Sequence, residues 1–259
     1  MIEALKQYRW YWRIEPGVKY SCAITYDPFV EMERRGKTYG YTAALWEIGE
    51  TCPSLFRAVD DFRKQQNIPA TPMWKALIEP SWAPLPIRRL LGWLGISHYD
   101  RTGNVWNLCH YWSNFEIADL DFFRGEAYQD LFHHLDREGG FYYERWGDAP
   151  VHSLAVHLLL PPEKVHHFSD VGYSHPPFFQ CPGNAPGGQL LENSALGPPD
   201  ENMSPERPGA VGCRCECIDE RRRNIQSVCL AKVQAPMSYH RPTWLQRFRK
   251  QYPYTVNIP

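Results

Sequence analysis

Hydrophobic and polar positions along the first 182 residues predict a mixture of short strands and helices. Aromatic or alternating apolar runs predict strands, and apolar residues spaced three or four positions apart predict helices. The predicted strands lie at residues 8–14, 38–47, 114–118 and 164–168. The predicted helices lie at residues 28–35, 54–66, 82–95, 126–137 and 150–160. Capping patterns support these limits, because Asp27 precedes Pro28, Ser54 precedes an apolar face and Gly139-Gly140 follows the fourth helix.

The predicted strand at residues 114–118 carries an acidic residue among apolar ones. Phe115 and Ile117 alternate with Glu116, so Glu116 is predicted to face away from them on a half-buried strand. Around it, residues 107–124 and 139–152 are rich in Trp, Phe and Tyr and contain several charged residues. These are Glu116, Asp119, Asp121, Glu144, Arg145 and Asp148. Aromatic faces cover the C–H faces of sugars, carboxylates accept hydroxyl protons and Arg pairs with phosphate, which favours a phosphate-bearing sugar ligand.

Two of the carboxylates have a structural interpretation beside the functional one. Asp148 stands just before the helix that Pro150 opens, so it either caps that helix or contacts a substrate. Glu15 opens the Glu15-Pro16-Gly17 triplet after the first strand, where a metal and a diphosphate can sit. An ordinary exit from strand to turn is the alternative, and the triplet alone favours it. Asp119 and Glu144 are expected either to support the site residues from behind or to be structural.

Residues 82–95 combine a strongly apolar sequence with two adjacent arginines, Arg88 and Arg89. A short helix packed on the core is the favoured interpretation. A mobile lid and a patch lying on a membrane surface are the alternatives. Under all three interpretations, we expect no site residue in this segment.

Composition narrows the classes of partner. The 259-residue chain has a net charge of -1, which argues against nucleic acid or an acidic membrane surface as the main partner. Aromatic residues make up 14% and include ten Trp, which favours carbohydrate. The eight Cys favour disulfides of unknown pairing in a secretory compartment, with zinc at Cys213-x-Cys215-x-Cys217 as the second interpretation. However, the chain shows neither a signal peptide nor a run of about 20 apolar residues, so we expect its front to be missing.

Five sequence motifs carry a family resemblance. In order along residues 8–182 they are YWRIEPGVKY, YDPF, NLCHYWSNFEIADLDFFR, GGFYYERWGDAPVH and HHFSDVGYSHPPFFQCP. With them the chain resembles the fungal Golgi alpha-1,2-mannosyltransferases, which extend O-linked and N-linked mannose chains using GDP-mannose and manganese. The resemblance implies an α/β, GT-A-like nucleotide-sugar transferase fold, of which only the C-terminal part is expected here. It also implies a retaining hexosyltransferase on the lumenal side of the Golgi membrane, with a type II membrane anchor in the full-length protein.

The same resemblance assigns roles to individual residues. Glu116 falls on the family's candidate nucleophile or charge-stabilising carboxylate. His175 and Glu15 fall on positions implied to hold Mn(II). The implied substrate-binding residues are Tyr143, Arg145 and Asp148. One departure is Gly17, which stands where the family normally has Asp and removes an expected carboxylate.

A second departure concerns the extent of the chain. Family members carry a long N-terminal half before the YWR motif, whereas this chain starts almost at the motif. The expected organisation is therefore a partial catalytic domain at residues 1–182, a Gly/Pro-rich loop at 183–212 and a Cys-containing tail at 213–259. The predicted function is transfer of mannose from GDP-mannose to mannosylated glycoprotein or oligosaccharide acceptors. A truncated or degenerate non-catalytic member is the alternative, and a glycoside hydrolase is a third hypothesis that only the carboxylates support.

Overall fold

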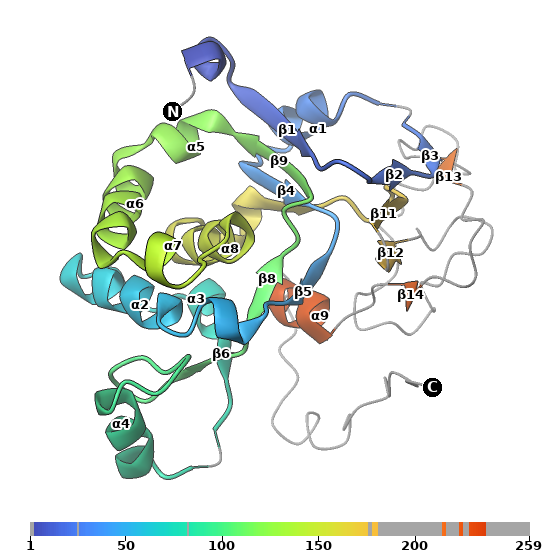
Figure 1. The fold of residues 1–259 in the computed structure, drawn as a ribbon. Coiled ribbons are helices and arrows are strands. Elements are labelled where there is room, and N and C mark those ends of the chain that lie inside the picture. The colour runs from blue at the N-terminus through green and yellow to red at the C-terminus, as the bar shows by residue number, and fades with distance from the viewer. Residues whose placement is uncertain are drawn as a thin grey trace.

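The computed structural model describes residues 3–24, 26–81, 83–175 and 178–180, with the short stretches 214–215, 223–224 and 228–236. A four-stranded sheet in the order β1-β9-β4-β10 lies at its centre (Figure 1). These strands are β1 (Trp10–Ile14), β9 (Phe115–Asp119), β4 (Tyr39–Tyr41) and β10 (Val165–His167). β9 runs antiparallel to both of its neighbours, whereas β4 and β10 are parallel. Glu116 therefore lies on an inner strand with a partner on each side.

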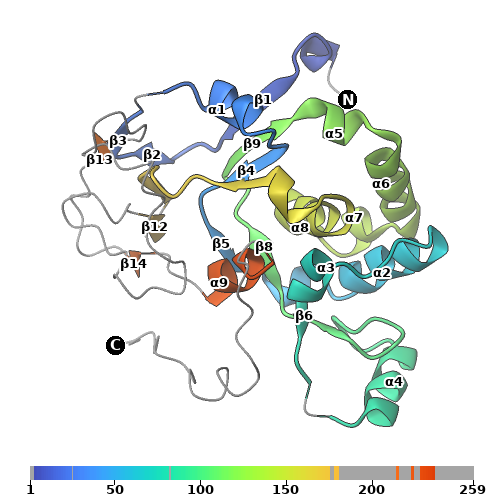
Figure 2. The ribbon, with the colours of Figure 1, turned by 180° about the vertical axis from the view of Figure 1, so that it is seen from behind.

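Most helices gather on one side of this sheet, as Figures 1 and 2 show from opposite directions. They are α2 (Leu55–Gln65), α3 (Pro72–Ala76), α5 (Leu120–Arg124), α6 (Glu126–Glu138), α7 (Gly140–Tyr143) and α8 (Asp148–Leu159). Their apolar sides form the larger core with Tyr39 and Ala118 of the sheet. On the other face, Met32 of α1 (Pro28–Arg34) packs with Phe115 and Ile117. Alternation along β9 thus divides its side chains between two cores.

Shorter elements surround the central sheet. A second four-stranded sheet contains β14 (Arg223–Asn224), β12 (Phe178–Gln180), β11 (Tyr173–His175) and β2 (Lys19–Tyr20). Two-stranded pairs join β3 (Cys22–Ala23) to β13 (Arg214–Cys215), β5 (Ala44–Trp46) to β8 (Cys109–Tyr111), and β6 (Ile78–Glu79) to β7 (Val105–Trp106). Single 3-10 turns lie at Glu3–Leu5, Gly49–Thr51 and Pro162–Lys164. None of the helices in the described ranges is long and apolar enough to cross a bilayer.

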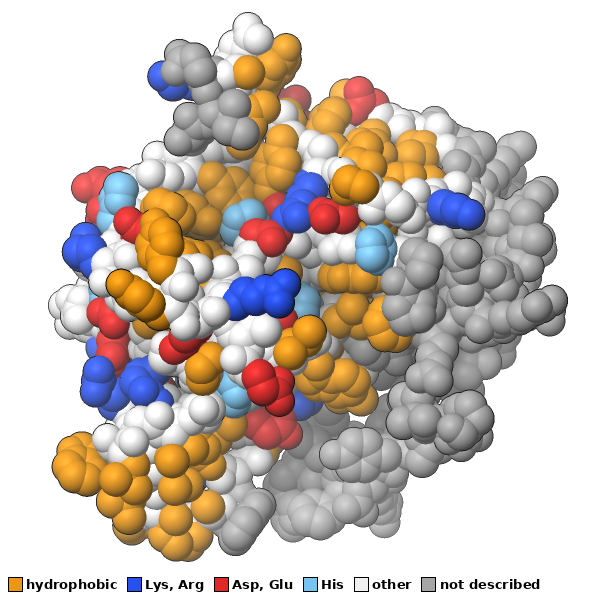
Figure 3. Space-filling model, viewed as in Figure 1, with side chains coloured by type: hydrophobic (Ala, Val, Ile, Leu, Met, Phe, Trp, Pro, Cys, Tyr) orange, Lys and Arg blue, Asp and Glu red, His pale blue; other side chains and the backbone are white. Residues whose placement is uncertain are grey.

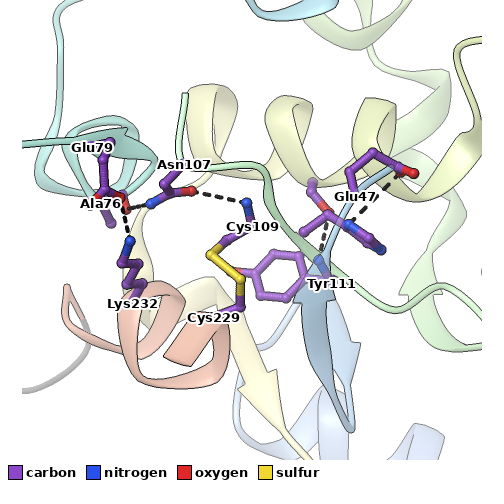
Figure 4. Close-up of a disulfide and its surroundings, with 10 residues drawn as sticks. Glu47, Ala76, Glu79, Asn107, Cys109, Tyr111, Cys229 and Lys232 are labelled. Carbon is purple, nitrogen blue, oxygen red and sulfur yellow. Dashed lines mark hydrogen bonds and ion pairs between the residues drawn. A yellow bond between two sulfur atoms is a disulfide. The ribbon is translucent and has the colours of Figure 1, made fainter. Parts of the chain in front are cut away.

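A disulfide ties the helix α9 (Val228–Gln234) to the core (Figure 4). It joins Cys109 of β8 to Cys229 across 120 positions of sequence, with 5.1 Å between the two Cα atoms. Lys232 of α9 also forms an ion pair with Glu79. Cys229 is fully buried, so α9 belongs to the core although it lies in the segment predicted as a tail. The expectation of disulfides is confirmed at this pair, while Cys52 is free and buried. Residues 183–212, Cys213 and Cys217 lie outside the described residues.

Local capping chemistry explains where two helices begin. The Asp27 carboxylate accepts the backbone N–H groups of Phe29 and Val30, which confirms the predicted start of α1. Ser54 stands at the predicted N-cap of α2, but its hydroxyl makes no capping bond. It donates instead to the Glu144 carboxylate at 2.6 Å, and that carboxylate also accepts the Ser54 backbone N–H at 3.1 Å. A side chain from a distant loop thus caps α2.

Three structural expectations were wrong. The strand β9 is not half-buried, because residues 115–118 are buried on both of its faces. Residues 38–47 do not form one strand, because the chain leaves the central sheet after β4 and pairs with β8 as β5. Residues 82–95 do form a helix, α4 (Leu85–Trp93), but its apolar side is exposed rather than packed on the core. Figures 1 and 2 both show α4 at the edge of the molecule, beyond α2 and α3. Sequence periodicity identified this helix but gave the wrong partner for its apolar face.

Candidate functional site

Glu116 lies at the centre of a buried polar cluster. Its side chain is fully buried on the helix-covered face of β9. The hydroxyl of Tyr39 donates to its Oε2 at 2.6 Å, and the hydroxyl of Tyr11 donates to its Oε1. From α8, His152 places Nδ1 3.0 Å from Oε2 and 3.1 Å from Oε1. Three side chains from three different elements therefore surround one carboxylate, which we call the Glu116 cluster.

Strand register explains how this cluster forms. Arg13 and Tyr41 lie directly opposite Glu116 on the two flanking strands. Tyr11 and Tyr39 lie opposite Ala118, two positions along β9 on the same face. The small Ala118 side chain leaves space in which the two tyrosine rings reach diagonally to the Glu116 carboxylate. A larger residue at position 118 would fill that space.

The neighbours of Glu116 keep it ionised in spite of its burial. Burial is the largest single influence and by itself raises the pKa of the Glu116 carboxyl. The charge interaction and hydrogen bond with His152, together with the bonds from Tyr11 and Tyr39, outweigh it and hold that pKa below its usual value. Burial and the Glu116 charge raise the pKa of Tyr11 and Tyr39 well above normal. The cluster therefore holds a negative charge among neutral phenols.

A second cluster lies beside the first and is open to solvent. Arg13, at the end of β1, donates from Nη2 to Glu15 Oε2 at 2.8 Å and from Nη1 to Asp148 Oδ2. Ser113 donates to the same Asp148 oxygen at 2.6 Å. The side chains of Arg13, Glu15 and Asp148 are 32%, 35% and 45% exposed. We call these four residues the Arg13 cluster. The Arg13 guanidinium thus joins Glu15 and Asp148, which the sequence analysis predicted as site residues independently of each other.

The position of Asp148 excludes one of its two interpretations, the capping of α8. α8 begins at Asp148 itself, and Gly147 is the N-cap residue, without a side-chain capping bond. The Asp148 carboxylate points to Arg13 and Ser113 instead. The capping interpretation is therefore wrong. A negative charge in the first turn still interacts favourably with the positive end of the helix.

Glu15 begins a tight turn between β1 and β2. The N–H of Val18 donates to the carbonyl of Glu15 at 3.4 Å, and Gly17 has φ +84°. Pro at the second position and a left-handed residue at the third are typical of a type II turn, which favours Gly at the third. A Cβ added to Gly17 would meet no atom within 4 Å. An Asp at this position would fit in space, and its cost would come from the backbone conformation.

His175 lies at the end of β11, in the second sheet. Its ring packs edge-on against Trp112, with 5.6 Å between the ring centroids. β11 pairs with β2, the strand that follows the Glu15 turn, through Tyr173 and Ser174. The two predicted metal ligands thus belong to adjoining segments. Within the described ranges, no group of three or more His, Cys, Asp or Glu side chains is placed to hold a metal.

The remaining predicted site residues lie outside both clusters. Tyr143, at the end of α7, is 90% exposed. Arg145 is exposed as well and makes no ion pair with any described residue. Between them, Glu144 accepts hydrogen bonds from Ser54 and, at 2.7 Å, from Trp146 Nε1. Glu144 is therefore structural, as expected. Asp119 is structural too, because it caps α5 through the N–H of Asp121.

The sequence did not single out the partners that complete the two clusters. These partners are Tyr11, Arg13, Tyr39, Ser113 and His152. A local signal existed for Tyr11 and Arg13, which occupy alternate positions of the first predicted strand and so share a face. Tyr39 and His152 had no such signal, because each reaches Glu116 from a distant segment.

Comparison with known proteins connects this geometry to a family. The family model for glycolipid 2-alpha-mannosyltransferase matches residues 1–187. The chain belongs to this family. It is 40% identical over 233 residues to O-glycoside alpha-1,2-mannosyltransferase homolog 4 of Schizosaccharomyces pombe, an alignment that covers 83% of this chain and 47% of the relative. It is 44% identical over 180 residues to the glycolipid 2-alpha-mannosyltransferase of Saccharomyces cerevisiae, covering 70% and 36%. This mannosyltransferase-family chain thus spans less than half the length of either relative.

Solved structures show the same fold. Core-mannan synthase A from Aspergillus fumigatus, in its Mn/GDP form, matches with a TM-score of 0.59 and 43% identity, covering 70% of this chain and 45% of that one. The mannosyltransferase Ktr4p from S. cerevisiae, in complex with GDP, matches with a TM-score of 0.57 and 34% identity, covering 69% and 43%. The predicted GT-A-like fold and the predicted family are confirmed.

Proposed function

We propose that this chain provides part of a retaining alpha-1,2-mannosyltransferase site that transfers mannose from GDP-mannose to mannose-terminated glycans of glycoproteins. The observation that carries the proposal is the Glu116 cluster, a fixed negative charge beside a half-exposed arginine. Glycosyl transfer passes through an oxocarbenium-like state, which a nearby carboxylate stabilises. Family membership and the GDP complexes of two related structures support a nucleotide-sugar donor.

The burial of Glu116 favours one of its two proposed roles. A nucleophile must approach the sugar carbon to about 3–3.5 Å. Glu116 is fully buried, and Tyr11, Tyr39 and His152 occupy its oxygens. We therefore propose that Glu116 supplies charge while the acceptor attacks from the face that the diphosphate leaves. Direct attack by Glu116 would first require Tyr11 or His152 to move away.

The Arg13 cluster supplies groups for the charged and hydroxylated parts of a donor. Arginine binds phosphate oxygens through two parallel hydrogen bonds, and carboxylates accept sugar hydroxyls. Arg13 is already held by Glu15 and Asp148, so a ligand phosphate would exchange with one of these partners. Arg145 and Tyr143 are exposed and free to contact donor or acceptor, as their motif implies.

Mn(II) is the proposed metal. Glu15 and His175 offer a carboxylate and an imidazole, both of which bind divalent first-row ions. Two protein ligands do not complete a coordination sphere, so oxygens of the bound diphosphate would have to supply further positions. When bound, the ion supplies Lewis-acid stabilisation of the departing diphosphate. Gly17 contributes no carboxylate to this set.

Binding of GDP, measured by calorimetry with and without Mn(II), tests the proposal. We expect metal-dependent binding that His175→Ala abolishes and that His133→Ala, an exposed histidine on α6, leaves unchanged. Folded protein that binds no GDP would overturn the proposal for this chain and favour the non-catalytic alternative, for which Gly17 is the supporting observation. Family membership would stand in either case.

We further propose that the protein works on the lumenal side of the Golgi membrane. The disulfide between Cys109 and Cys229 supports a secretory compartment, because such bonds persist where the surroundings are oxidising. The acceptor would be a mannosylated glycoprotein or oligosaccharide.

A further inference from the structure

Helix α4 presents apolar side chains to solvent, while buried Gly92 and the less exposed Arg88 and Leu91 face the protein. The exposed side chains are Leu85, Ile87, Leu90, Trp93, Leu94 and Ile96. Trp93 is 77% exposed, more than is usual for a tryptophan. Figure 3 shows the hydrophobic side chains gathered over α4 at the lower edge of the molecule. We call these six residues the α4 patch. Contiguous exposed apolar surface of this kind indicates an interaction site.

Close backbone packing fixes α4 in this orientation. Gly92 is buried, and a Cβ at this position would lie 2.2 Å from the backbone oxygen of Asp100. A Cβ on Gly103 would lie 2.5 Å from the backbone carbon of Arg88. Asp100 in turn holds its loop by accepting the N–H groups of Thr102 and Asn104, each at 2.8 Å. The helix is therefore anchored through two glycines, which leaves the α4 patch facing outward.

The segment that carries the patch contains charge of one sign only. Residues 80–99 contain Arg88 and Arg89 but no Asp or Glu. On the helix, Arg89 is four residues from Leu85 and from Trp93, so it lies within the exposed face. The whole chain has a net charge of -1, so any attraction to an anionic surface is local to this segment. Aliphatic side chains, one tryptophan and an exposed arginine are typical of a membrane-interface helix.

We propose that the α4 patch inserts into the interfacial region of a lipid bilayer that carries anionic headgroups. The leucines, isoleucines and Trp93 enter the boundary between headgroups and acyl chains, and Arg89 pairs with lipid phosphate. The protruding position of α4 allows contact with a flat surface (Figures 1 and 2). This contact is independent of the sugar-transfer site, because none of the six residues belongs to the Glu116 or Arg13 cluster.

Co-sedimentation of the folded chain with vesicles tests this proposal. The vesicles are phosphatidylcholine alone and phosphatidylcholine mixed with phosphatidylserine. We expect binding that is stronger with phosphatidylserine, and a fall on the order of tenfold or more in the partition coefficient for the double variant Leu90→Ser, Trp93→Ser. Arg89→Gln should reduce binding to the anionic vesicles by about fivefold.

Matched variants elsewhere on the surface distinguish this contact from non-specific adsorption to vesicles. Trp46→Ser removes a half-exposed tryptophan on β5, and Arg137→Gln removes an exposed arginine on α6. Both should bind vesicles as the unchanged chain does. Because Leu90 and Trp93 are exposed, the double variant should keep its circular dichroism spectrum and melting temperature.

Three outcomes would overturn the proposal. The first is an unchanged chain that binds neither kind of vesicle. The second is an equal loss of binding in the Trp46→Ser control. The third is self-association in analytical ultracentrifugation that Leu90→Ser abolishes in the absence of lipid binding, which would assign the α4 patch to a second copy of the chain.

Discussion

The Glu116 and Arg13 clusters are neighbours on one face of the sheet, yet they differ in almost every physical respect. Arg13 lies directly opposite Glu116 in the strand register. Glu116 is fully buried and accepts hydrogen bonds from neutral tyrosine hydroxyls, whereas Arg13 is 32% exposed and is shared between two carboxylates. One cluster holds a charge that water does not reach, and the other holds charges that water screens.

This difference matches two tasks of the glycosyl-transfer site that we propose. A charge that stabilises a transition state is most effective when its surroundings are fixed in advance and dry. Groups that bind and release a nucleotide sugar must exchange partners, which exposed ion pairs of low net strength allow. The buried cluster should therefore dominate the stability of the fold, and the exposed cluster should dominate binding. Substitutions in the two clusters should separate these effects.

The largest effect on stability is expected for Glu116→Leu. The change removes the acceptor for the hydroxyls of Tyr11 and Tyr39 and leaves both without this partner, Tyr39 fully buried and Tyr11 partly buried. At 1–3 kcal/mol for each orphaned donor, the free energy of unfolding should fall by roughly 4 kcal/mol. Chemical denaturation measures this, with Tyr41→Phe as the control, because the Tyr41 side chain is buried on the same sheet face but does not bond to Glu116. A loss below about 1 kcal/mol would contradict the proposed network.

The orientation of Glu116 was predictable from the sequence, but its surroundings were not. Strand alternation is local, so Phe115 and Ile117 sufficed to place Glu116 on the opposite face, as the structure confirms. Its burial depends on partners far along the chain, since Tyr11 and Tyr39 are 105 and 77 positions away. No period or spacing encodes such contacts. The sequence therefore predicted a half-buried strand, because it did not show that Tyr11 and Tyr39 would cover Glu116.

Two further errors also come from contacts between residues that are far apart in the sequence. Periodicity identified the α4 helix and its apolar side, but the direction in which that side faces depends on Gly92 and Gly103, which bring two backbones together. The strand expected at residues 38–47 divides because β5 finds its partner in β8, more than 60 residues later.

The family motifs identified Glu116, Asp148 and Glu15, but the arginine that joins the last two became visible only in the structure. The catalytic, substrate-binding and metal-binding roles assigned to all six predicted site residues stay predictions.

Acid should lower the free energy of unfolding through the buried residue His157. This residue is fully buried on α8, with Nδ1 2.8 Å from the Ser153 carbonyl and Nε2 3.3 Å from the Tyr111 hydroxyl. Burial lowers its pKa from 6.5 to about 4, although the bond to Ser153 opposes the shift. Between these values the unfolded chain binds a proton that the folded chain does not, so stability falls as the pH falls.

The expected loss from His157 is about 3 kcal/mol between pH 6.5 and pH 4, measured by urea denaturation across that range. His110, whose pKa burial also lowers to about 4, adds to the same slope. His157→Gln should reduce the slope of the profile in part, because His110 and His167, whose pKa values burial lowers to about 4, still contribute. His133→Gln, which changes an exposed ring, should leave the slope unchanged. Identical profiles for the unchanged chain and His157→Gln would show that His157 does not carry the acid response.

The smallest effect on stability is expected in the Arg13 cluster. Arg13→Gln and Asp148→Asn each remove one side of an ion pair whose members are 32% and 45% exposed. Solvent screening limits such pairs to about 1 kcal/mol or less, so the two single variants and their double-mutant cycle should show a coupling within that limit. If coupling reached about 3 kcal/mol, the pair would behave as a desolvated one. The two clusters would then be alike, and the division between a fixed charge and an exchangeable one would fail.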